Sequence, residues 1–146
     1  MDEERLVTQL MTDEGFSKTA YKDTEGFWTI GFGRLIDDSV SGAGITAAEG
    51  RLLLRNNVND TIKELDQKAK WWRKLPSDCQ DALANMAFNL GWPRLSTFKN
   101  MLAALESGDY ETAGIEAMDS KWANQVGDRA ERIAATFKAA ANKEVD

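Results

Sequence analysis

Histidine is absent from this sequence of 146 residues, and cysteine occurs once, as Cys79. Zinc and haem sites usually need histidine or several cysteines, and Ser/His or Cys/His catalysis needs an imidazole base. A single thiol also excludes a disulfide within the chain, which fits a reducing compartment. These absences leave carboxylate chemistry as the available kind of catalysis, and we expect neither a cofactor nor a metal.

Proline is scarce, and long apolar runs and low-complexity segments are missing. The chain has 2 prolines, 42% hydrophobic and 29% charged residues, a composition typical of an ordinary globular protein. Acidic residues outnumber basic ones by 24 to 18, and the net charge of −6 disfavours general attraction to nucleic acid. No apolar segment typical of a signal peptide or a membrane span follows the acidic residues 2–4, so we expect a protein made and folded in the cytoplasm.

The first third of the sequence contains a helical pattern followed by strand patterns. Apolar residues at helical spacing predict a helix over about residues 2–12 that ends near Glu14. Aromatic and β-branched residues over 20–22 and 27–32 then flank a turn sequence at residues 23–26. We therefore predict a β-hairpin whose turn glycine takes a positive φ.

Glycines and small polar residues follow the predicted hairpin. Gly31 and Gly33 allow the backbone to approach closely either a sugar or the neighbouring helix. Residues 37–44 are rich in Asp, Ser and Gly, so they predict a loop. The β region is therefore expected to be small.

A long helix is predicted next. Thr46 and Glu49 have the spacing of a capping box, and Ile45 is placed for a hydrophobic staple. Trp71 and Trp72 follow the helix, and because adjacent residues cannot share one helix face, we expect one to be buried and the other half-exposed. The alternative is a contact with the cell wall or a partner. After these residues the chain shows helical patterns without strand signals. The predicted helices cover residues 78–90, 96–106, 110–118 and 128–141.

These elements predict a mainly helical α+β fold. A small N-terminal lobe with the β-hairpin, residues 1–45, is joined by a long helix, residues 46–70, to an all-helical C-terminal lobe, residues 71–146. We expect these parts to form a single domain. Clefts between lobes are common binding sites, so a ligand is expected there.

Two carboxyl groups and a hydroxyl accompany the predicted hairpin. Glu14 lies near the end of the first helix, Asp23 in the turn and Thr29 on the following strand. Glycosidic bond hydrolysis needs an acid, a carboxylate and often a held water, which these groups can supply. Each residue also has an ordinary structural interpretation: a surface acid at a helix end, a turn residue bonded to its own backbone, and a common strand residue. Their combination favours the catalytic interpretation.

Two blocks of sequence occur in an order that is found in a known family. The first block is Glu14 followed by Tyr21-Lys22-Asp23-Thr24-Glu25-Gly26-Phe27-Trp28-Thr29-Ile30-Gly31-Phe32-Gly33. The second is Asn85-Met86-Ala87-Phe88-Asn89-Leu90-Gly91, then Thr97-Phe98-Lys99-Asn100, Lys121-Trp122-Ala123-Asn124-Gln125 and Arg129-Ala130-Glu131-Arg132. Over roughly residues 5–138 the chain resembles the phage T4-type lysozymes, glycoside hydrolase family 24. The resemblance implies a lysozyme-like fold.

The activity that the resemblance implies is that of a muramidase. Such an enzyme hydrolyses the β-1,4 bond between N-acetylmuramic acid and N-acetylglucosamine in peptidoglycan. Glu14 would be the general acid, kept protonated by partial desolvation, and Asp23 would stay ionised and stabilise oxocarbenium-like charge. The distance between the two carboxyl groups decides between inversion and retention, and the sequence leaves it open. Thr29 resembles a water-positioning hydroxyl, which favours inversion.

Five further residues are candidates for contacts with the substrate. Leu35 and Phe88 match positions that line the cleft in the family, and Arg129 resembles an arginine that approaches the general acid. Asn89 and Asn124 are candidate hydrogen-bond donors. We expect peptidoglycan glycan strands as the partner, no nucleic acid, no stable membrane insertion, a monomer, and access to the cell wall without a signal peptide.

Some positions depart from the family. Arg34 stands where the family usually has histidine, and Asn57 where its best-known phage member has an acid on the long helix. We therefore expect Arg34 to be a fixed cation beside a neutral amide. Met101 and Glu116 replace a serine and an asparagine that bind sugar in that member. Met86, Phe98 and Trp122 are expected to lie in the core.

Three hypotheses about function remain open. The first is an endolysin-type lysozyme of phage or prophage origin that lyses bacterial cells. The second is a non-catalytic wall-binding or phage tail module of the same fold, against which the intact Glu14, Asp23 and Thr29 argue. The third is a related glycosidase that cleaves chitin-like polymers.

Overall fold

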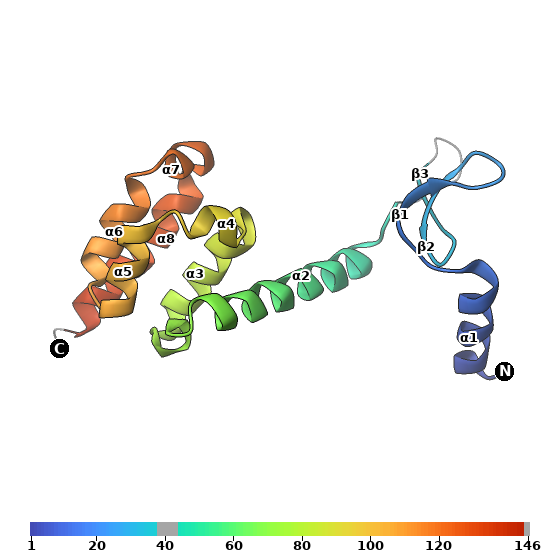
Figure 1. Cartoon of the computed structure of the whole chain (residues 1–146), viewed down its shortest axis with the longest axis horizontal. Coiled ribbons are helices and arrows are strands. Elements are labelled where there is room, and N and C mark those ends of the chain that lie inside the picture. The colour runs from blue at the N-terminus through green and yellow to red at the C-terminus, as the bar shows by residue number, and fades with distance from the viewer. Residues whose placement is uncertain (38–43, 145–146) are drawn as a thin grey trace. The chain divides into compact units, whose positions relative to one another are not determined.

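The chain forms two compact units, Met1–Leu53 and Leu54–Asp146. Their elements are labelled in Figure 1, which draws the computed structural model. The structure describes residues 1–37 and 44–144, so most of the predicted loop at 37–44 lies outside the described residues. The boundary between the units falls within the long helix α2 (Ala47–Lys68).

The N-terminal unit contains one helix and a small antiparallel sheet. Helix α1 (Glu3–Glu14) is followed by strands β1 (Ser17–Lys22), β2 (Trp28–Gly31) and β3 (Arg34–Asp37), in the order β1-β2-β3 (Figure 1). The predicted hairpin is β1 and β2. Strand β3 was not predicted, because its 4 residues are too few for an alternating pattern to stand out.

The hairpin turn forms as its residue types predict. The N–H of Asp23 donates to the carbonyl of Phe27 at 2.9 Å, and the N–H of Gly26 donates to the carbonyl of Asp23 at 3.0 Å. Gly26 has a φ of 88°, which confirms the predicted positive φ. A tight turn therefore joins β1 to β2.

The predicted capping box opens helix α2. The N–H of Thr46 donates to Oε1 of Glu49 at 2.9 Å, and the N–H of Glu49 donates to Oγ1 of Thr46 at 3.1 Å. This reciprocal pair of hydrogen bonds satisfies two amide groups that have no partner within the helix. The prediction of a helix beginning after Thr46 is confirmed.

The described part of the C-terminal unit is helical. After α2 come η1 (Trp72–Lys74), α3 (Ser77–Leu90), α4 (Trp92–Leu95), α5 (Lys99–Ser107), α6 (Tyr110–Met118), α7 (Lys121–Val126) and α8 (Asp128–Glu144). The four predicted helices correspond to α3, α5, α6 and α8. The sequence did not predict α4 and α7, because helices of 4 and 6 residues show no periodic pattern. Among the described residues, no helix combines the length and the apolar character that crossing a membrane requires.

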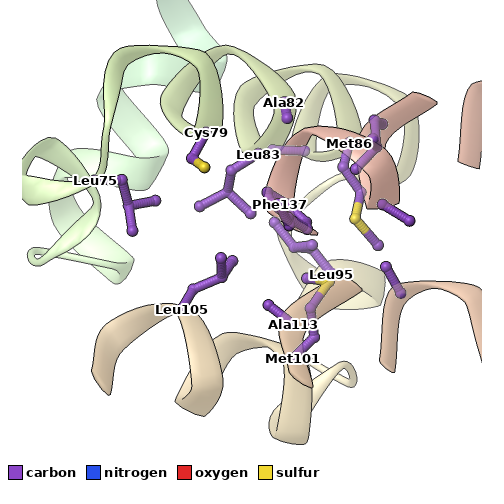
Figure 2. Close-up of a cluster of buried hydrophobic side chains, with 14 of the residues drawn as sticks. Leu75, Cys79, Ala82, Leu83, Met86, Leu95, Met101, Leu105, Ala113 and Phe137 are labelled. Atoms are coloured by element: carbon purple, nitrogen blue, oxygen red, sulfur yellow. The ribbon is translucent and has the colours of Figure 1, made fainter. Parts of the chain in front are cut away.

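One hydrophobic core stabilises the C-terminal unit. Figure 2 shows Phe137 from α8 among side chains of α3, α4, α5 and α6. Phe137 and Leu83 are 0% exposed, and the predicted core residues Met86 and Trp122 are 0% and 3% exposed. Phe98, the third predicted core residue, is only partly buried and packs against the core, with its ring edge-on to Trp122. Burial of such side chains contributes about 1.5–3 kcal/mol each. Within residues 1–36 and 44–53, by contrast, Thr29 is the only buried side chain.

Polar contacts fix the turn that follows α2. Asp66 accepts hydrogen bonds from Nε1 of Trp72 at 2.7 Å and from Nε and Nη2 of Arg73 at 2.9 and 3.1 Å. The bonds from Arg73 and then Trp72 hold the pKa of Asp66 below its ordinary value. Trp72 is buried and Trp71 is half-buried, which confirms the prediction for this pair.

Small residues allow α6 and α8 to pack closely. Gly114 on α6 lies beside Lys138 and Ala134 of α8. A Cβ atom on Gly114 would lie 2.6 Å from Cγ of Lys138 and 2.9 Å from the carbonyl oxygen of Ala134. Because the second of these atoms belongs to the backbone, a side chain at this position would separate the helices.

This packing predicts that replacing Gly114 by alanine destabilises the protein, although the same change in a helix is normally stabilising. Gly→Ala inside a helix normally stabilises a protein by about 0.4–1 kcal/mol. Gly50→Ala on α2 should do so, because its Cβ would meet only Cδ1 of Ile45 at an ordinary 3.7 Å. Gly114→Ala should instead lower the free energy of unfolding by about 1–3 kcal/mol through overpacking. Urea unfolding followed by circular dichroism measures both, and a stabilising Gly114→Ala would contradict the packing described.

Candidate active site

Glu14 is the last residue of α1, and its carboxyl group contacts the loop between β2 and β3. The contact is with Gly33, where an added Cβ atom would lie 2.7 Å from Oε2 and 3.0 Å from Cδ of Glu14. From the sequence, the backbone at this glycine is expected to approach either a sugar or the neighbouring helix. The structure shows a close approach to Glu14 at the end of helix α1. Apart from this contact, the side chain of Glu14 is exposed.

Asp23 is held by the turn that it begins. Its Oδ1 accepts hydrogen bonds from the N–H of Glu25 at 2.9 Å and the N–H of Phe27 at 2.8 Å. Asp23 is therefore a turn residue bonded to the local backbone, as its ordinary interpretation predicted. Both bonds end on the same oxygen, so the carboxylate is oriented while Oδ2 keeps the capacity to accept other donors.

Thr29 lies on the central strand of the sheet. It pairs with Tyr21 on β1 and Leu35 on β3, and its side chain is 2% exposed. The hydroxyl donates to the carbonyl of Phe27 at 3.0 Å. A hydroxyl that has donated its proton still has lone pairs, so the oxygen of Thr29 keeps the capacity to accept a hydrogen bond.

The backbone of Phe27 connects these residues, and sequence reasoning missed it. Its N–H donates to Asp23, and its carbonyl accepts from the hydroxyl of Thr29 and the N–H of Asp23. The signal available in the sequence was the spacing of Asp23 and Thr29 on either side of Phe27. The structure thus joins Asp23 and Thr29 through one peptide segment, with Leu35 opposite Thr29.

Arg34 has an acidic partner, contrary to the expectation of a cation beside a neutral amide. Its Nη2 donates to Oε1 of Glu49 at 2.8 Å and to the carbonyl of Gly44 at 3.0 Å. The acid is the last residue of the capping box and the third residue of α2, instead of a residue further along the helix. The capping motif in the sequence could have indicated this partner.

Glu49 therefore serves two interactions with one oxygen. Its Oε1 accepts from both the N–H of Thr46 and the guanidinium of Arg34. The hydrogen bonds with Thr46 and then the charge of Arg34 hold the pKa of Glu49 below its ordinary value of 4.5.

The remaining candidates lie in the C-terminal unit. Asn89 accepts from Nε1 of Trp122 at 2.7 Å, and Arg129 donates from Nε to Oδ1 of Asn85 at 2.9 Å. Phe88 is 39% exposed, and Asn124 on α7 is exposed. The amide of Asn89 is thus oriented by Trp122, and its NH₂ group retains donors.

Three pockets of this unit contain candidate residues. One, of about 630 Å³, is lined by residues that include Arg129. A second, of about 480 Å³, is lined by residues of α2, η1, α3 and α8 that include Phe88 and Arg129. Another, of about 650 Å³, is lined by residues that include Met101 and Glu116. Met101 is 1% exposed and belongs to the core.

The mainly helical α+β fold, with its small antiparallel sheet after the first helix, is lysozyme-like. The model of the phage lysozyme family matches residues 11–136. The chain belongs to this family, which confirms the resemblance to the T4-type lysozymes.

Individual relatives carry the names of lysozymes, a peptidoglycan hydrolase and a phage spike protein. The chain is 29% identical to a probable T4-type lysozyme 2 of Dictyostelium discoideum over 95% of its own length and 96% of the relative. It is 30% identical to the pre-baseplate central spike protein Gp5 of Enterobacteria phage T4, with 88% of this chain covering 26% of that protein. It is 30% identical to the peptidoglycan hydrolase gp36 of Pseudomonas phage phiKMV, with 84% of this chain covering 14% of that protein. The family and its hydrolase members support lysozyme-type glycosidase activity.

Glu49 gives a prediction about stability and pH. Because its pKa is lower in the folded protein, ionised Glu49 stabilises the fold above its ordinary value of 4.5, and this stability is lost as pH falls through the folded value. Glu49→Gln should be less stable than the native chain at about pH 7, and the difference should shrink towards about pH 3. Urea unfolding at a series of pH values measures the difference in the free energy of unfolding between the native chain and the variant. Because both proteins contain Asp66, the effect of its titration cancels in this difference.

Arg34→Gln is the matched variant for this experiment. It removes the charge of Arg34 but keeps the hydrogen bonds with Thr46, which are the larger cause of the lowered pKa. It should therefore retain more of the pH dependence than Glu49→Gln does. A stability difference for Glu49→Gln that stays constant with pH would contradict this account.

Proposed function

We propose that the chain is an endolysin-type lysozyme, a muramidase that hydrolyses the β-1,4 bonds between N-acetylmuramic acid and N-acetylglucosamine in bacterial peptidoglycan and so lyses cells. The observation that carries this proposal is the placement of the Glu14 carboxyl group against the β2–β3 loop. The sheet of that loop also contains Thr29, which is linked to Asp23 through Phe27. Family membership supports the same reaction class.

Glu14 is the general acid in this proposal. As the bond between the anomeric carbon and the glycosidic oxygen breaks, its electron pair goes to that oxygen, which takes the proton of Glu14. A general acid near neutral pH needs an environment that disfavours its charged form. Since Glu14 is exposed within its own unit, bound glycan is the source of desolvation that we propose.

Asp23 and Thr29 act on the opposite side of the sugar. Asp23 takes a proton from a water whose oxygen attacks the anomeric carbon, and its negative charge stabilises the oxocarbenium-like transition state. Thr29 accepts a hydrogen bond from that water and orients it. This mechanism inverts the configuration at the anomeric carbon.

Substrate contacts complete the proposal. Leu35 lies directly across from Thr29 in the sheet, and we propose that it contacts the sugar beside the reacting water. We propose that Phe88 packs against the glycan and that Asn89 and Asn124 donate hydrogen bonds to it. Arg129 has further guanidinium donors besides the Nε bound to Asn85, and these are available to a carboxylate. The enzyme acts as a monomer.

The role of Glu14 can be tested by removing its proton while keeping its shape. Glu14→Gln should lower the rate of peptidoglycan cleavage at least about 100-fold with folding intact, because it cannot protonate the leaving oxygen. Glu25→Gln is the matched control, since Glu25 is an exposed acid in the hairpin turn. Reducing ends released from purified peptidoglycan measure the rate. Retention of activity by Glu14→Gln would assign the acid to another residue.

The stereochemistry of the product tests the roles of Asp23 and Thr29. Inversion predicts that NMR spectra recorded early in the reaction show the α-anomer at the new reducing end. Asp23→Asn keeps Oδ1 for the turn and removes the charge, so it should nearly abolish turnover without unfolding the hairpin. Thr29→Val should also lower turnover if the water is held by the hydroxyl. A β-anomer as first product would make Asp23 a covalent nucleophile instead.

A structural role is the second candidate function. The similarity to the central spike protein of phage T4, of which this chain spans about a quarter, favours it. The cleavage experiment separates the two, because a structural module would bind peptidoglycan and release no reducing ends. Parallel incubation with chitin oligomers would identify a chitin-cleaving glycosidase.

A further inference from the structure

We propose that Gly33 is a positioning residue for the general acid. The lack of a side chain at residue 33 allows the carboxyl group of Glu14 to lie directly against the backbone between β2 and β3. This inference rests on the proposed function of Glu14 and adds a second residue on which the placement of the acid depends.

The geometry at Gly33 points to one neighbouring side chain. A Cβ atom added there would lie 2.7 Å from Oε2, 3.0 Å from Cδ and 3.3 Å from Cγ of Glu14. All three distances are shorter than the roughly 3.5–4.0 Å at which non-bonded atoms attract. The three nearest atoms all belong to Glu14, so a substituent would displace this side chain before any other.

The effect of such a displacement should fall on catalysis more than on folding. Glu14 is exposed, and its carboxyl group is the end of a flexible side chain, so it can rotate away at low cost. A general acid must stay within hydrogen-bond reach of the oxygen that it protonates. A misplacement of about 1 Å can cost about 100-fold in rate.

Gly31 is a matched control for the backbone. Gly31 and Gly33 have φ angles of 66° and 77°, in the region that favours glycine. A Cβ atom on Gly31 would meet nothing within 4 Å. Alanine should therefore strain the backbone at both positions, but only at residue 33 should it also displace Glu14.

The experiment compares Gly33→Ala with Gly31→Ala in the full chain. The two variants should lose similar amounts of stability in urea unfolding. On purified peptidoglycan, kcat should be at least about 30-fold lower for Gly33→Ala than for Gly31→Ala, with KM similar in both. Equal activity of the two variants would overturn the proposal, because a general defect of the loop would then explain any loss.

A second measurement locates the Glu14 side chain without using activity. Its carboxyl ¹³C signal, assigned by its disappearance in Glu14→Gln, should move in Gly33→Ala and stay close to the native position in Gly31→Ala. An unmoved signal in Gly33→Ala would overturn the proposal. If the native chain cleaves no glycan, the proposed function fails, and this signal still decides whether Gly33 sets the position of Glu14.

Two asparagine variants keep the test decisive if the alanine variants do not fold. Asparagine tolerates positive φ better than alanine and carries the same Cβ atom. Gly33→Asn and Gly31→Asn should then show the same contrast in kcat and in the Glu14 signal. Absence of the contrast in folded variants would overturn the proposal.

Discussion

The pairing of β2 with strands on both sides is the constraint on which the candidate site depends. Hydrogen bonding to β1 fixes the turn that begins with Asp23, and hydrogen bonding to β3 fixes the loop that contains Gly33. Thr29 lies on β2 between this turn and this loop, and it is a buried polar residue. Because side chains alternate along a strand, a slip of one residue in β2 would turn Thr29 to the other face of the sheet and misplace both connections. The small sheet therefore serves mainly to fix the relative positions of a few polar groups.

Much of the fold could be predicted from the sequence, since long helices and tight turns have local signals. The capping box predicted the start of α2, and residues 110–118 were predicted with the bounds that α6 has. The missed elements are short: β3, η1, α4 and α7 have 4, 3, 4 and 6 residues. Segments of this length form because tertiary neighbours stabilise them, and local sequence carries little record of those neighbours.

The candidate site shows the same difference between local and distant information. Glu14, Asp23 and Thr29 were recognised by residue type and spacing, and their roles remain predictions. The contact between Glu14 and Gly33 joins residues nineteen apart in sequence, and the sequence alone offered two interpretations of that glycine. The link through Phe27 was missed because it uses backbone atoms, which every residue has. The partner of Arg34 was predicted wrongly, because comparison with the family directed attention to position 57.

Glu49 illustrates how one ordered side chain can favour a second interaction. An exposed ion pair usually gains little, because two long side chains must give up their freedom to form it. Here the hydrogen bonds with Thr46 already restrict the rotamers of Glu49, so forming the pair orders only the side chain of Arg34. The entropy lost on pairing is correspondingly smaller than for two free side chains. A glutamate in the first turn of a helix thus also provides a fixed anchoring point for the first residue of a strand, and its ordering stabilises both elements at once.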